Sequence, residues 1–279
     1  MCNLGSINFA RIKDTVELES VVYLAAKFLV CGSIRAELPF ERCYEVRENY
    51  RKIGLGIMGM HEWLLKRGYQ YSIPEELRAW LQIWKDASIR GADSCTTTNN
   101  VSQCTKYRCV APAGTISIIA GTTSGIEPLY AVAMKRRFLS GNTWKYEYII
   151  DPMAELLIQS GIDPEKIETS TDLSKDIARR LEFQAVVQEY TDMAISSTIN
   201  LPSWGSEYNN DSTVVDTLQL VRKYAPRLRG LTFYPDGSRG GQPLVSIPYK
   251  EAVGKTGQTL TEGLDFLTQV SCTSGACGI

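Results

Sequence analysis

The sequence predicts an α/β fold, because short strand-like runs alternate with longer helical segments several times along its 279 residues. A chain of this length suffices for one large or two ordinary domains with a substantial core. We find no internal repeat, and no low-complexity linker precedes the last part of the chain. We expect a folded domain over residues 1–244 and a flexible tail over residues 245–279.

Helices are predicted where apolar residues recur at helical spacing. The predicted segments are residues 14–31, 45–66, 74–92, 151–161, 173–194 and 213–224. Asp151 suits a helix cap and Gly161 a helix stop. The second segment contains Gly54, Gly56 and Gly59. Since each glycine inside a helix costs about 1 kcal/mol, we expect these three to permit close packing or a bend.

Strands are predicted where β-favouring residues form short runs bounded by turn residues. These runs are residues 2–9, 107–111, 129–134, 195–201 and 231–234. The polar residues 94–103 predict a loop. Beyond about residue 245 the apolar periodicity fades and glycines are scattered, which predicts the mobile tail.

Composition excludes several classes of function. The net charge of −1 gives no strong field for nucleic acid or an anionic membrane. No apolar run approaches the length that spans a bilayer, and the first residues lack the features of a signal peptide, so we expect a cytoplasmic protein. The eight cysteines are then expected as thiols, redox pairs or ligands. His61, the only histidine, is expected to be a packed or surface residue.

The residues 107–121 form the most informative local pattern. A β-favouring run ends at Pro112, Ala113 and Gly114 form a short turn, and a helix is expected from Thr115 through Ile116 and Ser117. Such a junction directs backbone N–H groups and the positive end of the helix dipole at one point, which suits an anion. The two hydroxyls suit phosphate oxygens. The alternative is an ordinary strand-to-helix turn with a threonine cap.

Four stretches, taken in order, resemble one protein family. They are Cys2–Asn8 (CNLGSIN), Arg51–Gly59 (RKIGLGIMG), Ala111–Ser117 continuing to Gly125–Pro128 (APAGTIS and GIEP), and Ser197–Pro202 (STINLP). Each is weak alone, but their order and spacing are similar to the C-terminal half of the ribonucleotide reductase catalytic subunit. The resemblance extends to about residue 244.

This resemblance implies the later half of a ten-stranded α/β barrel. It implies that substrate phosphates lie on the turn Pro112–Ser117, where Ala113 replaces the family's usual threonine. It also implies that Cys2 is one of two cysteines that supply the electrons for removing the ribose 2′-hydroxyl by thiyl-radical chemistry. A dithiol can supply two electrons by closing to a disulfide.

The family's Asn-Pro-Cys-Gly-Glu loop, which carries the thiyl cysteine, is absent from this sequence, and so are the second reducing cysteine and the allosteric specificity region. The resemblance therefore implies a segment that is inactive without an N-terminal complement. A split-gene product, a trans-spliced segment and a truncated reading frame remain open.

Residues 230–239 indicate which class of the family this chain resembles, and the class implies how the catalytic radical is generated. Family members that import a radical from a metal-containing partner place two tyrosines where this chain has Phe233 and Tyr234. The stretch is more similar to the adenosylcobalamin-dependent class II enzymes, so adenosylcobalamin is the implied cofactor, held together with the N-terminal complement. A class I large-subunit segment with a metal-radical partner remains the alternative.

The cysteines near the C-terminus, Cys272 and Cys277, resemble the tail pair that re-reduces the active site with electrons from a thioredoxin-like external dithiol. Zinc binding by Cys95, Cys104 and Cys109 is the rival, but one histidine and no Cys-x-x-Cys pair argue against a metal. Cys31 and Cys43 are expected to be structural.

The expected function is thus that of a ribonucleoside-diphosphate reductase segment, acting on ribonucleotides and needing its complement. The alternative from another class is a non-catalytic nucleotide-binding or assembly remnant. Retention of redox cysteines favours the enzyme. The sequence does not decide between diphosphate and triphosphate substrates.

Overall fold

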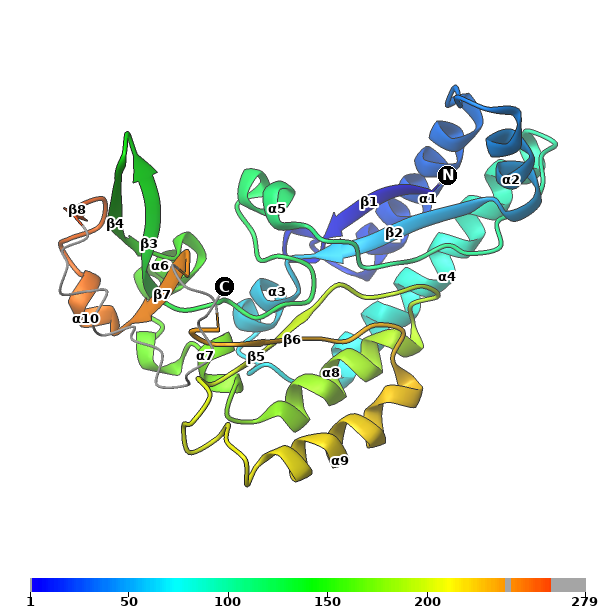
Figure 1. Cartoon of the computed structure of the whole chain (residues 1–279). Coiled ribbons are helices and arrows are strands. Elements are labelled where there is room, and N and C mark those ends of the chain that lie inside the picture. Colours follow the sequence, from blue (N-terminus) through cyan, green and yellow to red (C-terminus); the bar gives the residue numbers. More distant parts are fainter. Residues whose placement is uncertain (1, 239–241, 262–279) are drawn as a thin grey trace. The chain divides into compact units, whose positions relative to one another are not determined.

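The computed structural model, drawn in Figure 1, describes residues 2–238 and 242–261. The chain divides into two compact units. Of the described residues, unit 1 comprises 2–128, 176–199 and 215–233, and unit 2 comprises 129–175, 200–214, 234–238 and 242–261. The sequence predicts a single folded domain up to residue 244, so this division was not foreseen.

Three elements, β5, α9 and β6, have residues in both units and are grouped with unit 1. In chain order the elements of unit 1 are β1 (Cys2–Asn8), η1 (Phe9–Arg11), α1 (Thr15–Arg35), α2 (Glu41–Tyr50), β2 (Lys52–Met58), α3 (Met60–Lys66), α4 (Glu75–Thr98), α5 (Gly114–Ala120), α8 (Ile177–Glu189), β5 (Thr198–Leu201), α9 (Val214–Tyr224), η3 (Ala225–Arg227) and β6 (Thr232–Pro235).

The strand pair β1–β2 of unit 1 is parallel, and so are the isolated bridges that extend it. β1 pairs with β2 in register from Cys2–Lys52 to Asn8–Met58. Parallel bridges then join Lys52 to Lys106 and Val110 to Ile195. Residues 105–110 thus lie between β2 and the residues that lead into β5, and β5 in turn neighbours β6. This succession follows the order of the predicted strands 2–9, 107–111, 195–201 and 231–234, although residues 107–111 do not form a continuous strand.

β2 corrects the predicted helix over residues 45–66. Ile53, Leu55 and Ile57 alternate with glycines and are almost fully buried in a strand. Gly56 permits close packing, because a Cβ there would lie 2.6 Å from the carbonyl oxygen of Cys109. The helical parts of the segment are separate, with α2 before the strand and α3 after it.

Helices α1 and α4 pack against each other and confirm two predicted helices, both of which run further than expected. Asp14 caps α1 by accepting bonds from the backbone of Val16 and Glu17. A Cβ on Gly91 of α4 would overlap the carbonyl oxygen of Tyr23 of α1, so glycine allows this close crossing. α4 continues to Thr98, through part of the segment predicted as a loop.

Helices α8 and α9 bury an apolar cluster with β5 and β6. Its buried members are Leu181, Ala185, Ile199 and Tyr224, with Ile177, Leu220, Leu228, Leu231 and Phe233 packed against them. The predicted helix 173–194 is confirmed only as the shorter α8, because residues 174–176 and 190–194 are not helical. α7 ends at Leu173, and α8 starts afresh after Asp176, which caps it by accepting a bond from the backbone of Arg179.

Unit 2 contains an antiparallel sheet in the order β7–β3–β4–β8. Its elements are β3 (Ala133–Ser140), β4 (Thr143–Ile150), α6 (Pro152–Gln159), η2 (Pro164–Lys166), α7 (Ser170–Leu173), β7 (Leu244–Ile247), α10 (Tyr249–Ala252) and β8 (Thr259–Thr261). The predicted strand 129–134 begins later, at Ala133, and the β3–β4 hairpin was not predicted. Asp151 caps α6 and Gly161 follows it at φ 95°, as predicted.

The expected flexible tail starts at residue 245, but residues 244–261 form β7, α10 and β8. Ala133, Tyr148, Ile150 and Ala252 make a small core that joins these elements to the hairpin. The rest of the expected tail, with Cys272 and Cys277, lies outside the described residues. Among the helices that the structure describes, none combines the length and apolar content needed to cross a membrane.

Candidate functional site

The four stretches singled out in the sequence lie on neighbouring strands of the unit 1 sheet. The first is β1, the second is mostly β2, the third follows residues 105–110, and the fourth contains β5. Ligands of open parallel sheets bind beyond the carboxyl ends of the strands, because the loops there converge on one edge. The segments that leave this edge are therefore the candidate site.

The turn Pro112–Ser117 leaves the sheet at that edge and leads into α5. Ala113 is the N-cap, with φ −119° and ψ 21°, and no side chain caps the helix. The backbone N–H of Ser117 bonds to the carbonyl of Ala113 at 2.8 Å. The N–H groups in the first turn of a helix have no partner within it. The predicted turn and helix are therefore present, whereas the predicted strand 107–111 is reduced to isolated bridges at Lys106 and Val110.

The side chains at the turn differ from expectation in one respect. Thr115 is exposed, but Ser117 is buried and its hydroxyl donates to the carbonyl of Gly114 at 2.9 Å. Pro112, Gly114 and Ile116 are exposed, and a Cβ on Gly114 would meet no atom within 4 Å. The backbone around Gly114 is thus open to a ligand, while the Ser117 hydroxyl is already engaged.

A polar cluster joins the ends of β1 and β2 to the turn that follows α5. Thr122 Oγ1 lies 2.5 Å from Glu62 Oε2 and 3.3 Å from Asn8 Oδ1. Glu62 is fully buried and forms an ion pair with Lys66 Nζ at 2.6 Å. Gly59 has a φ of 74°, and a Cβ there would overlap Asn8 Oδ1. Sequence reasoning missed this cluster, although Asn8, Gly59 and the polar turn all stood inside or beside the quoted motifs.

A second network ties the third motif to the fourth. Glu127 Oε1 accepts a bond from the backbone of Thr198 at 2.6 Å. Arg180, which is 2% exposed, donates to Ser197 Oγ at 3.0 Å and to the carbonyl of Thr198 at 2.8 Å. Arg180 also donates to the hydroxyl of Tyr71, and that hydroxyl bonds to the carbonyl of Ile126. The network fixes residues 126–127 against the start of β5.

His61 packs against this network. Its ring meets the ring of Tyr71 edge-on, with centroids 5.5 Å apart. Complete burial, and secondarily the charge of Arg180, lowers the pKa of His61 to about 3. A neutral, buried imidazole is a packing residue here, in agreement with the expectation from sequence.

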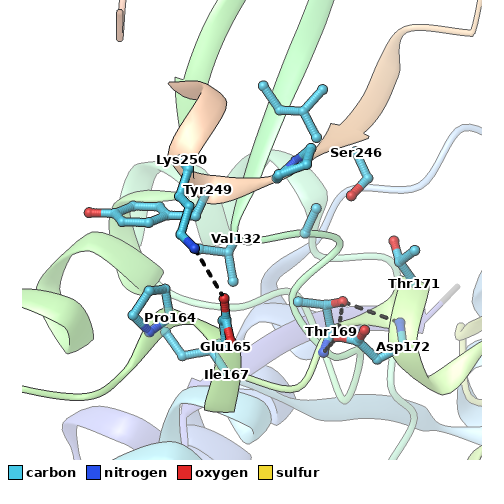
Figure 2. A pocket seen from close by; sticks show the side chains of 13 residues that line it. Val132, Pro164, Glu165, Ile167, Thr169, Thr171, Asp172, Ser246, Tyr249 and Lys250 are labelled. Carbon is cyan, nitrogen blue, oxygen red and sulfur yellow. Dashed lines mark hydrogen bonds and ion pairs between the residues drawn. The ribbon is translucent and has the colours of Figure 1, made fainter. Parts of the chain in front are cut away.

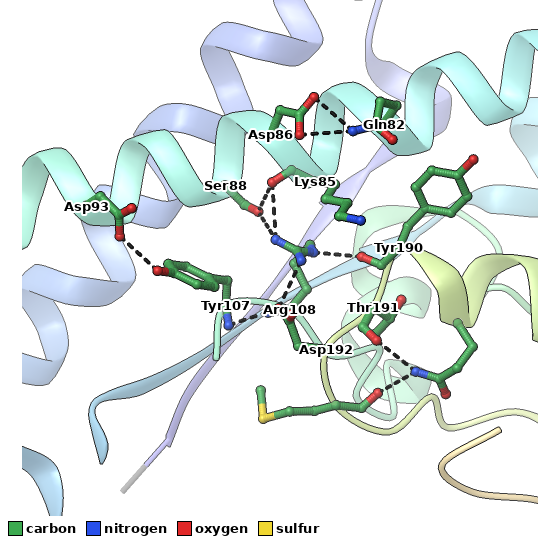
Figure 3. A network of polar contacts seen from close by, with 12 residues as sticks. Gln82, Lys85, Asp86, Ser88, Asp93, Tyr107, Arg108, Tyr190, Thr191 and Asp192 are labelled. Carbon is green, nitrogen blue, oxygen red and sulfur yellow. Dashed lines mark hydrogen bonds and ion pairs between the residues drawn. The ribbon is translucent and has the colours of Figure 1, made fainter. Parts of the chain in front are cut away.

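Arg108 holds residues 105–110 in place (Figure 3). Its guanidinium bonds to Asp192 Oδ2 at 3.0 Å, to the carbonyl of Tyr190 at 2.7 Å and to Ser88 Oγ at 2.8 Å. Asp192 Oδ2 also accepts from the backbone of Tyr107 and Arg108 at 3.1 Å each. Burial lowers the pKa of Arg108, and the charge of Asp192 opposes that shift. The ion pair with Asp192 anchors this segment to the residues that follow α8, and the bond to Ser88 anchors it to α4.

The expected redox cysteines are placed only in part. Cys2 pairs with Lys52 at the start of β1 and β2, and Lys52 in turn pairs with Lys106. The turn follows Val110, four residues after Lys106 and toward the other end of the strands. Cys2 and the turn thus lie at different levels along the strands. The Cys2 side chain, Cys272 and Cys277 are not among what the structure describes, so their roles stay predictions. In the described parts of the chain, no three His, Cys, Asp or Glu side chains gather as metal ligands.

Two cavities lie among the described residues of unit 2. One, of about 470 Å³, lies between η2, α7 and the β7–α10 junction, where Lys250 Nζ stands 3.8 Å from Glu165 (Figure 2). The other, of about 390 Å³, is lined by the end of β5, by α7 and by Asp236. The side chains lining the first cavity include the capping box of α7, formed by Thr169 and Asp172. These residues satisfy each other's hydrogen bonds, which gives them a structural role.

Comparisons with known proteins agree with the resemblance. Residues 1–86 and 105–228 match the family described as the ribonucleotide reductase barrel domain. A vitamin B12-dependent ribonucleoside-diphosphate reductase of Mycobacterium tuberculosis (strain CDC 1551 / Oshkosh) is 30% identical, with 94% of this chain and 43% of that protein aligned. A protein of the same description from Thermoplasma acidophilum is 27% identical, over 88% of this chain and 37% of its own length.

A further relative is a putative adenosylcobalamin-dependent ribonucleoside-triphosphate reductase of Mycobacterium phage D29, 27% identical over all of this chain and 44% of its own. The crystal structure of a B12-dependent, class II ribonucleotide reductase matches with a TM-score of 0.70 and 20% identity, covering 91% of this chain and 40% of that one. The chain spans about two fifths of the length of these relatives.

Proposed function

Since this chain belongs to the ribonucleotide reductase barrel-domain family, we propose that it supplies the C-terminal half of the ten-stranded catalytic barrel. Its partner in this proposal is an N-terminal part that carries the thiyl cysteine. Together they convert ribonucleotides to 2′-deoxyribonucleotides. The succession of the neighbouring segments β1, β2, 105–110, β5 and β6 supports a half-barrel.

The observation that carries the proposal is the position of the turn Pro112–Ser117. It leaves the carboxyl edge of the parallel sheet, begins a helix, and has an open backbone at Gly114. Backbone N–H groups at a helix start bind phosphate through hydrogen bonds and the helix dipole. In the proposed mechanism this turn orients the nucleotide by its phosphates, and the substrate's ribose extends toward the middle of the barrel.

Cys2 is proposed as one of the two thiols that supply electrons during reduction. The reduction of one ribonucleotide oxidises this pair to a disulfide and releases the 2′-oxygen as water. Cys272 and Cys277 are proposed to restore the pair by thiol–disulfide exchange, and a thioredoxin-like dithiol then reduces the tail.

The proposed cofactor is adenosylcobalamin, because relatives are described as vitamin B12-dependent or as adenosylcobalamin-dependent. It would supply the initial radical. The cavities lined by unit 2 measure about 470 and 390 Å³. Pockets of about 300–1,000 Å³ hold drug-sized ligands, and this cofactor is larger. Those cavities do not fit it, so we assign it to the complementary part and derive no step through it.

Phe233 favours the cobalamin class over a metal-containing radical partner. It packs against the apolar cluster of α8 and α9, and a phenylalanine has no phenolic proton to lose with an electron. The preferred substrate is a diphosphate, as in the names of the Mycobacterium tuberculosis and Thermoplasma relatives.

The experiment that tests the phosphate turn is nucleotide binding to Gly114→Val, measured by calorimetry with a ribonucleoside diphosphate. A side chain over the open backbone should weaken binding at least tenfold, or about 1.4 kcal/mol. Ile119→Ala, an exposed change at the other end of α5, should leave binding unchanged. Equal affinity in all three proteins, with unaltered thermal unfolding, removes the assignment.

The activity itself is tested by adding the chain to its N-terminal complement with adenosylcobalamin, a dithiol and a ribonucleoside diphosphate. Deoxynucleotide should form over many turnovers. Cys2→Ser should bind substrate but fail to turn over repeatedly. A variant that cycles normally would show that Cys2 has no redox role, and an inactive mixture that still binds nucleotide would favour the non-catalytic alternative.

A further inference from the structure

A pair of thiols outside the proposed reaction lies between α1 and α4. Cys31 Sγ and Cys95 Sγ are 3.4 Å apart, although 64 positions separate them in the chain. Cys31 is exposed and Cys95 is buried. The sequence suggests a structural role for Cys31 and gives no reason to pair it with Cys95.

The surroundings give the two thiols different properties. The Cys95 thiol is directed at the carbonyl of Lys27 at 3.7 Å, and Asn99 Nδ2 donates to its sulfur at 3.5 Å. Burial raises the pKa of Cys95, and the neighbouring Cys31 adds to this shift. Because Cys31 is exposed and Cys95 is buried, a dissolved oxidant reaches Cys31 first, and Cys95 is close enough to react with the oxidised Cys31.

The packing of the two helices keeps the thiols within reach. Gly91, one turn before Cys95, lets the backbone of α4 approach the carbonyl of Tyr23. Tyr23 also donates from its hydroxyl to Ser94 Oγ at 3.0 Å. A disulfide has an S–S length of about 2.0 Å, so side-chain rotation has to bring the sulfurs together from 3.4 Å while the helices stay in place.

We propose that Cys31 and Cys95 form a reversible disulfide that cross-links α1 to α4 when the protein meets a hydroperoxide. The Cys31 thiol is oxidised to a sulfenic acid while the peroxide O–O bond breaks and an alcohol, or water from hydrogen peroxide, is released. The Cys95 thiol then attacks that sulfur, the S–S bond forms, and water leaves. A dithiol reverses the step by exchange and is itself oxidised to a disulfide.

The cross-link has a structural consequence for β1. Asn3 Nδ2 donates to the carbonyl of Leu29 at 3.0 Å, and a Cβ on Gly32 would lie 2.9 Å from the same nitrogen. The residues of α1 on either side of Cys31 thus hold the side chain of Asn3. Oxidation would fix the part of α1 that supports the start of the sheet.

The test treats the full chain with hydrogen peroxide, blocks the remaining thiols with N-ethylmaleimide, and maps peptides by mass spectrometry without reduction. A peptide pair joined through Cys31 and Cys95 is expected, and it should disappear after treatment with a dithiol. The oxidised protein should also melt at a higher temperature than the reduced one. Cys31→Ser should lose both effects, and Cys43→Ser, a half-buried cysteine on α2, should keep both.

Cys95→Ala provides a second measurement that does not depend on the melting temperature. Without the second thiol, the sulfenic acid on Cys31 should persist and be trapped by dimedone. The proposal is overturned if Cys31 and Cys95 are alkylated or overoxidised separately with no joined peptide. It is equally overturned if Cys31 is joined to another cysteine instead.

Discussion

Replacing Gly56 by alanine tests how tightly residues 105–110 pack on β2. A Cβ at this position would lie 2.6 Å from the carbonyl oxygen of Cys109 and 3.3 Å from Ser6 Oγ. Because the first obstacle is a backbone atom, no side-chain rotation relieves it. The segment that carries the candidate phosphate turn must then move away from β2.

The expected loss of stability combines two effects. Forcing an extra methyl group into a packed site costs about 1–3 kcal/mol. Moving the segment also strains the bonds from the backbone of Ile53 to Lys106 and of Leu55 to Tyr107, 3.1 and 2.9 Å long, and each such bond contributes about 1 kcal/mol. We expect Gly56→Ala to lower the free energy of unfolding by about 2–4 kcal/mol.

Urea unfolding followed by tryptophan fluorescence measures this change. The buried tryptophans Trp63, Trp80 and Trp84 all belong to unit 1. Their fluorescence therefore reports on the unfolding of the unit that contains Gly56. Gly114→Ala is the matched control, since its added methyl group meets no atom within 4 Å. If both variants unfold at the same urea concentration as the parent, the close approach at Gly56 does not support the sheet.

Two further predictions concern buried polar groups. The unfolded chain binds a proton on His61 below about pH 6.5, but the folded chain does so only near its lowered pKa of about 3. Stability should therefore fall as the pH drops below about 6.5, by about 2 kcal/mol at pH 5. Urea unfolding at pH 7 and pH 5 should show this loss in the parent and not in His61→Phe, and an equal loss in both would contradict it. Arg108→Met leaves Asp192 without its buried partner and should cost about 3–5 kcal/mol in the same assay, whereas a cost below about 1 kcal/mol would show that the pair contributes little.

The sequence identified the candidate turn because its chemistry is local. Proline and glycine at residues 112 and 114 mark the end of an extended run and the start of a helix, whatever surrounds them. The cluster of Asn8, Glu62 and Thr122 could not be found in this way. Its members are brought together only when β1, β2 and the turn after α5 are already in place.

The error at β2 has a different cause. Ile53, Leu55 and Ile57 alternate with glycines, which is the period of a strand. The apolar residues that follow, such as Trp63 and Leu64, belong to α3 and made the whole stretch look helical. A reading that weighted the two-residue alternation at residues 53–57 above the apolar content of the whole stretch would have predicted the strand.

The β3–β4 hairpin, which was not predicted, and the start of α8, which was placed too early, are both marked by local residues in the sequence. Gly141 at φ 60° sits in the turn between β3 and β4, and a glycine beside an asparagine is a common hairpin turn. Asp176 likewise marks a fresh helix start within the predicted segment 173–194. The pairing of β7 and β8 with that hairpin was not predictable, because it depends on residues more than 100 positions apart.

Each of the two units is assembled from three separate stretches of chain. No single cut can separate them, so a truncation ending at residue 128 would deprive unit 1 of residues 176–199 and 215–233 as well as deleting unit 2. After a single cut by limited proteolysis, the fragments should therefore stay associated and separate only when the protein is denatured. Isolating either unit would require rejoining its stretches by circular permutation or designed linkers.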